Sequence, residues 1–176
     1  MKNDAGGFVL RLNDERPRSR IILASSYIEE LIRQGVLACL NRNKAAEALF
    51  GEDGRMNASQ TRQFAEALGL ISCEEANAVK TLAQVRNRFS HDWRADFTGL
   101  DIQRICERFG IINIRHSSEM DSHQVAFAKA DYIGISLVEV LGNRFVWARE
   151  SSPYSSMRIK HILVDPESNQ RTVEWK

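Results

Sequence analysis

The 176-residue chain lacks the cysteine patterns that mark several classes of protein. It has only three cysteines, Cys39, Cys73 and Cys106, which are widely spaced and lie in apolar, helix-like surroundings. An odd and scattered set does not suggest a disulfide framework, and no Cys/His spacing of a zinc site is present. We therefore expect three small buried core residues in a reducing compartment, and we predict no metal and no cofactor.

Long apolar runs are also missing. The nearest approach is Ile21–Ile28, which Glu29 and Glu30 follow at once, so this run is not a membrane span or a signal segment. We expect a cytoplasmic protein without membrane contact. The sequence contains no Gly-rich phosphate loop and no G-x-S-x-G elbow, so neither of these sites is predicted.

An excess of charge of one sign is absent as well. The chain has 24 Lys and Arg against 23 Asp and Glu, a formal net charge of +1. Proteins that grip duplex DNA unaided usually show a clear basic excess or patch. Arginines concentrate in the middle of the chain, but carboxylates largely balance them: Arg86, Arg88, Arg94, Arg104, Arg108 and Arg115 against Asp92, Asp96, Asp101 and Glu107. We predict a solvated face of mixed charge there.

The composition, 43% hydrophobic and 27% charged, is that of an ordinary globular protein with a core. Helical periodicity covers most of the chain and predicts an all-α fold, a bundle of about five to seven helices over residues 16–148. Residues 1–15, which include Gly6 and Gly7, are predicted to be a flexible arm. Residues 149–176 are predicted to be a C-terminal extension, either irregular or hairpin-like.

Local signals place the individual helices. Ser72 with Glu75, and Asn57 with Gln60, have the spacing of helix N-terminal caps, and Gly69 suits a helix C-terminus. The predicted helices cover residues 18–40, 45–49, 57–68, 73–90, 98–109 and 120–141. A very short link predicts that the third and fourth form an antiparallel hairpin. Small residues in the first of these helices, Ser25 and Gly35, would let another helix approach closely.

The C-terminal extension holds two β-leaning runs, at residues 159–164 and 172–175, around a polar turn. Three outcomes are open for these runs. They could pair as a small hairpin, cover a hydrophobic face, or form a mobile tail.

The stretch from Thr81 to Asp92 is the most informative part of the chain. The apolar residues of this stretch recur at helical spacing and predict a stripe that faces the core. Arg86 lies at the edge of that stripe. Asn87 and His91 lie four residues apart and so share a neighbouring face. An arginine at the rim of a core is costly to place, so it needs either a structural partner or a ligand.

Two resemblances rest on these residues. The hexapeptide from Arg86 to His91 matches the R-N-x-x-x-H pattern of HEPN-type helical domains, many of which are metal-independent ribonucleases or their inactive relatives. The wider span, from Ser19–Glu30 through Glu66–Ser72 to that hexapeptide, resembles the mannitol operon repressor (MtlR) family over roughly residues 18–148. The first resemblance implies an RNA-cutting or RNA-binding homodimer, and the second implies a regulator of transcription.

The ribonuclease interpretation assigns a role to each residue of the motif. His91 would be the base, Arg86 would hold the phosphate oxygens, and Asn87 would orient either the imidazole or the phosphate. On an ideal helix, however, Arg86 and His91 point about 140° apart. They would converge only if the helix ended near Phe89, or if the two chains of a dimer each supplied residues to one shared site. In the structural alternative, Arg86 and Asn87 satisfy carbonyls at the helix end and His91 caps it.

A regulator of transcription must act on DNA, either by binding it directly or through a partner. In a helix-turn-helix, the predicted helix 73–90 would enter the groove with Glu74 and Glu75 at its start, and two carboxylates there would repel phosphate. We therefore predict a corepressor that acts through a protein partner, and the resemblance implies a homodimer. We do not expect direct DNA binding, and RNA binding is left open. Trp93 could stack a base, but we expect it to pack in the core or at an interface.

Overall fold

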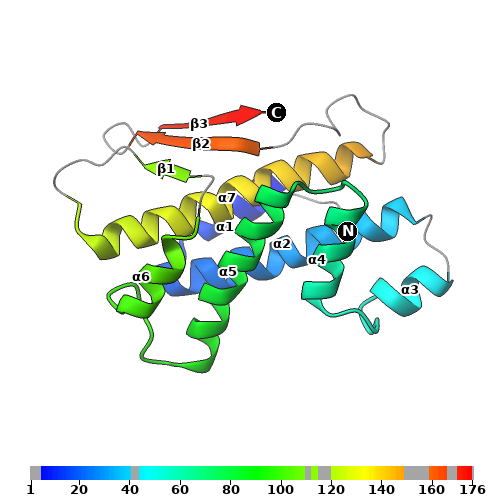
Figure 1. Ribbon diagram of the computed structural model, residues 1–176, viewed down its shortest axis with the longest axis horizontal. Helices are drawn as coiled ribbons and strands as arrows, with labels where there is room; N and C mark the ends of the chain where they lie inside the picture. Colours follow the sequence, from blue (N-terminus) through cyan, green and yellow to red (C-terminus); the bar gives the residue numbers. More distant parts are fainter. Residues whose placement is uncertain are drawn as a thin grey trace.

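The computed structural model describes residues 5–40, 44–109, 112–114, 120–148, 159–165 and 170–175. Within these residues the chain forms seven helices and one small sheet (Figure 1). The helices are α1 Ala5–Leu12, α2 Pro17–Cys39, α3 Lys44–Phe50, α4 Ala58–Ala67, α5 Cys73–His91, α6 Leu100–Cys106 and α7 Ser122–Ala148. The strands are β1 Ile112–Ile114, β2 Ile159–Asp165 and β3 Gln170–Trp175. The predicted all-α bundle is confirmed.

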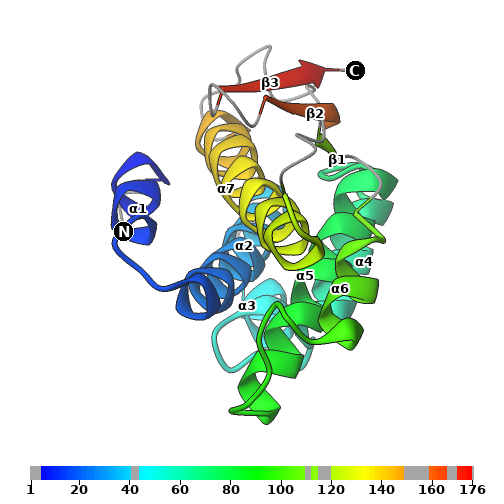
Figure 2. The same ribbon diagram turned by 90° about the vertical axis from the view of Figure 1, so that its left-hand side faces the viewer.

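Helices α2 and α7 pack against each other at the centre of the bundle. Figure 2 shows α1 on one side of this pair, and α4, α5 and α6 on the other. The contact is close because small residues lie in it. A Cβ atom placed on Gly35 would lie 2.7 Å from the ring of Phe145, and one placed on Gly134 would lie 3.3 Å from Ala24. The expectation that Gly35 lets a neighbouring helix approach is therefore confirmed.

The helix termini follow the local sequence signals. Asn57 and Gln60 form a complete capping box before α4, and Ser72 and Glu75 form another before α5. Gly69 adopts a φ of 68° just after α4, a left-handed conformation that glycine reaches without strain. Figure 1 shows α4 and α5 running in opposite directions, as the short link between them predicts.

The prediction of a loose N-terminal arm is wrong for residues 5–12. These residues form α1, whose Leu12 is 1% exposed and packs with Ala24 and Ile135. The ring of Phe8 stacks on Tyr27 with centroids 4.0 Å apart. Two glycines give this segment a low intrinsic helix propensity, so contacts with α2 and α7 stabilise the helix.

The C-terminal runs pair as an antiparallel hairpin, from Ile159 opposite Trp175 to Asp165 opposite Gln170. The hairpin alternative is thus confirmed. The sequence did not predict β1, which pairs parallel with β2 and makes the sheet order β1-β2-β3. Figure 1 shows this sheet lying along α7.

Two helices and two cysteines differ from expectation. Helix α6 is shorter than the predicted 98–109 segment, and α7 extends to Ala148 rather than ending near residue 141. Cys106 is buried as predicted, but Cys39 and Cys73 are exposed because they are the last residue of α2 and the first of α5. Among the described residues, no helix has the length and apolar character needed to cross a membrane.

Candidate functional site

The first residue of the R-N-x-x-x-H motif makes a structural contact. Nη2 of Arg86 donates to Oε1 of Glu29 at 2.5 Å, and this ion pair joins α5 to α2. The two side chains are 26% and 21% exposed, so solvent only partly screens their attraction. Arg86 lies at the edge of the buried stripe, where its spacing predicts it.

The other two motif residues have a different environment. Asn87 and His91 are exposed, and neither side chain has a hydrogen-bond or ion-pair partner within the part of the chain that the structure describes. Helix α5 continues through His91. Since the helix does not end near Phe89, Arg86 and His91 diverge by about 140° in one chain. A single chain therefore does not bring the three residues together, although Asn87 and His91 share a face.

The C-terminal end of α5 is satisfied by a residue from another helix. The guanidinium of Arg18, in α2, donates to the backbone oxygen of Phe89, and its Nη1 donates to the backbone oxygen of Trp93 at 2.6 Å. The same guanidinium lies 5.8 Å from the ring centre of Phe89. A cation at this position favours the helix end electrostatically. The structural role expected for Arg86 and Asn87 thus belongs to Arg18.

Trp93 follows directly and lies at the surface. Its side chain is 77% exposed, so Trp93 does not pack in the core, and packing at an interface stays a prediction. The guanidinium carbon of Arg94 lies 4.9 Å from the centre of the indole ring, a cation–π contact. Figures 1 and 2 show that the loop after α5 lies at the end of the bundle away from the sheet.

The loop that carries Trp93 is held by its own side chains. Asp92 Oδ1 accepts the backbone N–H of Arg94 at 2.9 Å, and Asp96 Oδ1 accepts the backbone N–H of Thr98 at 2.9 Å. The Thr98 hydroxyl also donates to Asp96, and these hydrogen bonds lower the pKa of Asp96. Phe97 is 7% exposed and contacts Phe89 edge to face, with ring centres 5.2 Å apart.

The charges around the site are mixed, as the sequence predicts. Nε of Arg88 lies 2.5 Å from Oδ2 of Asp101, and both side chains are about half exposed. Nη1 of Arg108 donates to Gln84 at 3.4 Å. In the described residues, no group of three or more His, Cys, Asp or Glu side chains is placed to hold a metal ion.

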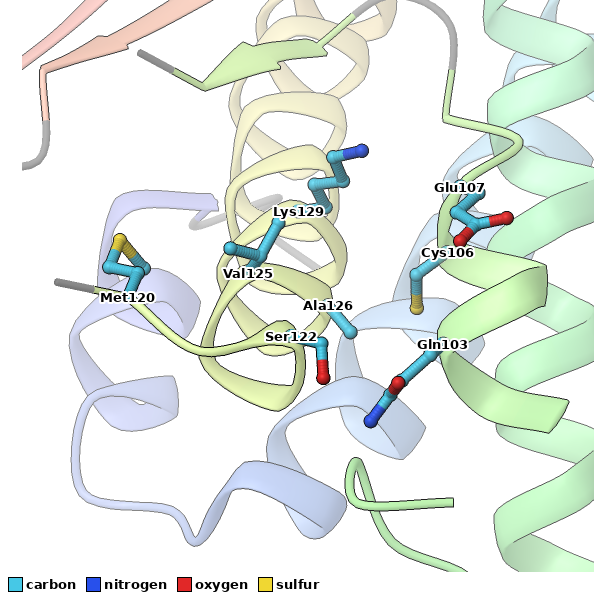
Figure 3. A pocket seen from close by; sticks show the side chains of 8 residues that line it. All are labelled: Gln103, Cys106, Glu107, Met120, Ser122, Val125, Ala126 and Lys129. Atoms are coloured by element: carbon cyan, nitrogen blue, oxygen red, sulfur yellow. The ribbon is translucent and has the colours of Figure 1, made fainter. Parts of the chain in front are cut away.

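A pocket of about 290 Å³ lies between α6 and the start of α7 (Figure 3). Cys106 and Ala126 line it together with polar side chains that include Lys129 and Glu107. Burial raises the pKa of the Cys106 thiol to about 12, so the thiol is protonated at neutral pH and is a poor nucleophile. The volume lies just below the range for small-molecule sites, roughly 300–1,000 Å³. We assign no chemistry to this pocket.

Sequence reasoning located Arg86, Asn87 and His91 but missed the residues around them. Nothing in the sequence pairs Arg86 with Glu29 or places Arg18 at the end of α5, because these contacts join segments far apart in the chain. The exposure of Trp93 had a usable signal, namely the polar residues on either side of it. No family model matches the chain, and neither does a curated protein or a solved structure at a significant level.

Proposed function

We propose that the protein is a non-catalytic transcriptional regulator of the mannitol-operon-repressor type, a cytoplasmic homodimer that acts as a corepressor through a protein partner. The observation that carries the proposal is the ion pair between Arg86 and Glu29. A ribonuclease needs a cation free to receive the phosphate, whereas this guanidinium already has a carboxylate partner. Arg86 is therefore engaged within one chain and is not free to receive a phosphate.

Charge placement argues against direct reading of an operator. At the start of α5, Glu74 is exposed and Glu75 is fully buried in an ion pair with Arg144. An exposed carboxylate repels the DNA backbone, and a buried one cannot reach a base. The overall charge of +1 gives no general attraction to DNA. A protein partner that itself binds DNA accounts for regulation without these contacts.

A HEPN-type metal-independent endoribonuclease is the second candidate. One observation favours it: Asn87 and His91 are exposed on a shared face and have no partner among the described residues. In a homodimer, the two copies of this face could approach each other and supply a base to one substrate. The cation would then have to be a residue other than the paired Arg86, or the ion pair would have to open.

Incubation with labelled single-stranded RNA, without added metal, separates the two candidates. We would compare the wild type with His91→Ala and with His123→Ala, which changes an exposed histidine in the first turn of α7. The regulator proposal expects no cleavage by any of the three. Cleavage by the wild type and His123→Ala, but not by His91→Ala, would establish the ribonuclease instead.

Two further measurements test the regulator directly. Sedimentation equilibrium should give twice the monomer mass, and a monomer at all concentrations would contradict the dimer. Transcript profiling of a strain lacking the gene should show a small set of raised messages that return to normal with the wild-type gene. Tight and salt-resistant binding of the purified protein alone to the promoters concerned would contradict the corepressor role.

A further inference from the structure

The loop after α5 presents Trp93 on a fixed backbone. The carbonyl of Trp93 accepts from Arg18, and the N–H of the next residue donates to Asp92, so both ends of the peptide group on the C-terminal side of Trp93 are held by side chains. A large side chain on a preorganised backbone loses little conformational freedom when it is bound. Tryptophan and arginine are also the residues most enriched at the energetic centres of protein interfaces.

Two guanidinium groups that contact Trp93, one at its ring and one at its backbone oxygen, have no carboxylate partner within the described residues. Arg94 lies over the ring, and Arg18 donates to backbone oxygens. The carboxylates of the loop and of the first turn of α6, by contrast, are already engaged. Asp92 and Asp96 accept backbone N–H groups, and Asp101 pairs with Arg88. The guanidinium groups of Arg94 and Arg18 are therefore available to pair with a carboxylate of a binding partner.

We propose that Trp93, Arg94 and Arg18 form a docking surface, the Trp93 surface, for an acidic segment of a partner protein. An apolar side chain of that segment packs on the indole, and its carboxylates pair with the two guanidinium groups. Leu100, the first residue of α6, is 68% exposed and is the next exposed large apolar side chain after Trp93 in the sequence. This inference rests on the proposed function, because it specifies the partner through which the regulator acts.

A nucleic acid fits the Trp93 surface less well than an acidic peptide. Stacking a base on Trp93 is chemically reasonable, but the strand would carry a phosphate at every nucleotide. Residues 92–101 contain one arginine against three aspartates, Asp92, Asp96 and Asp101. A polyanion would lie against these carboxylates, whereas a peptide can place one or two charges opposite the guanidinium groups and none elsewhere.

A selection from a random peptide display library on the full-length protein tests the proposal. Enriched peptides and a uridine homopolymer RNA are then titrated against the wild type, Trp93→Ala and Arg94→Glu. Two matched controls change exposed residues outside the loop: Leu10→Ala in α1 and Arg55→Glu between α3 and α4. Thermal melting of each variant checks that it is folded.

We expect the enriched peptides to be acidic with an apolar residue. Trp93→Ala and Arg94→Glu should weaken their binding roughly tenfold or more, while both controls bind as the wild type does. The absence of enrichment, or peptides that bind Trp93→Ala normally, would overturn the proposal. RNA binding that depends on Trp93, in place of peptide binding, would overturn it in favour of a base-stacking surface.

The proposed function and this surface fail in distinguishable ways. If the peptides bind as expected while deletion of the gene leaves transcripts unchanged, the surface holds and the regulator role is wrong. If deletion alters transcripts and Trp93→Ala complements it fully, the regulator role holds and the surface is not the one it uses.

Discussion

Both oxygens of the Glu75 carboxylate accept hydrogen bonds from Arg144, at 2.7 and 2.8 Å. The two side chains are 0% and 3% exposed, so this bidentate pair is buried between the start of α5 and α7. Oε2 of Glu75 also accepts the backbone N–H of Ser72 at 2.9 Å, and Arg144 donates to the backbone oxygen of Leu70 at 3.1 Å. One carboxylate therefore caps a helix and anchors a second helix.

Removing either partner of this pair should destabilise the protein strongly. We expect Glu75→Gln and Arg144→Met each to lower the free energy of unfolding by about 3–5 kcal/mol, because the remaining charge is left buried without its counter-ion. Urea denaturation measures this. The double variant should lose much less than the sum of the two, and additive losses would contradict the pairing.

The contact between Arg86 and Glu29 should contribute less, because both side chains are partly exposed. We expect Arg86→Ala to cost about 1–2 kcal/mol of stability, and Asn87→Ala, at the neighbouring exposed position, to cost close to nothing. A double-mutant cycle with Glu29→Gln should give a favourable coupling energy. A coupling of zero would show that Arg86 is held by something other than Glu29.

Gly35 should tolerate no side chain. Alanine normally favours a helix interior over glycine by about 1 kcal/mol, but a Cβ here would lie 2.7–2.9 Å from ring atoms of the buried Phe145. We expect the destabilisation from overpacking to exceed the gain in helix propensity, so that Gly35→Ala lowers the melting temperature. Adding Phe145→Leu should recover part of the loss. A melting temperature above that of the wild type would mean that α2 and α7 separate easily.

Thiol reactivity should separate the cysteines. A hydrogen bond with Glu66, and its charge, raise the pKa of the exposed Cys73 thiol. A raised pKa leaves less thiolate at a given pH, so in a Cys39→Ser background Glu66→Gln should speed alkylation of Cys73 near pH 8 and shift its rate profile to lower pH. Cys106, with a pKa of about 12, should react only after unfolding. If Cys73 is alkylated at the same rate with and without the Glu66→Gln substitution, the interaction between Glu66 and Cys73 is excluded.

Much of the helical fold could be predicted because its signals are local. Ser72 with Glu75 and Asn57 with Gln60 are pairs three residues apart, and the structure contains both capping boxes. The stripe that places Arg86 at the rim of the core is likewise a property of one helix. Such patterns depend on neighbours along the chain, so the sequence carries them directly.

The parts that could not be predicted depend on distant segments. Helix α1 has two glycines and depends on contacts with α2 and α7, and β1 has three residues whose partner follows α7. The motif was found, but the partner of Arg86 lies 57 residues away, and Arg18 reaches Phe89 across 71 residues. No spacing rule connects positions so far apart.

The parallel pairing of β1 with β2 has a consequence for the order of folding. The whole of α7 lies between the two strands in sequence, so their pairing closes a long loop for the few hydrogen bonds of a three-residue strand. We expect the helices to assemble first and this edge to join last. Hydrogen exchange should then show rapid exchange at Ile112–Ile114 while the middle of α2 stays protected.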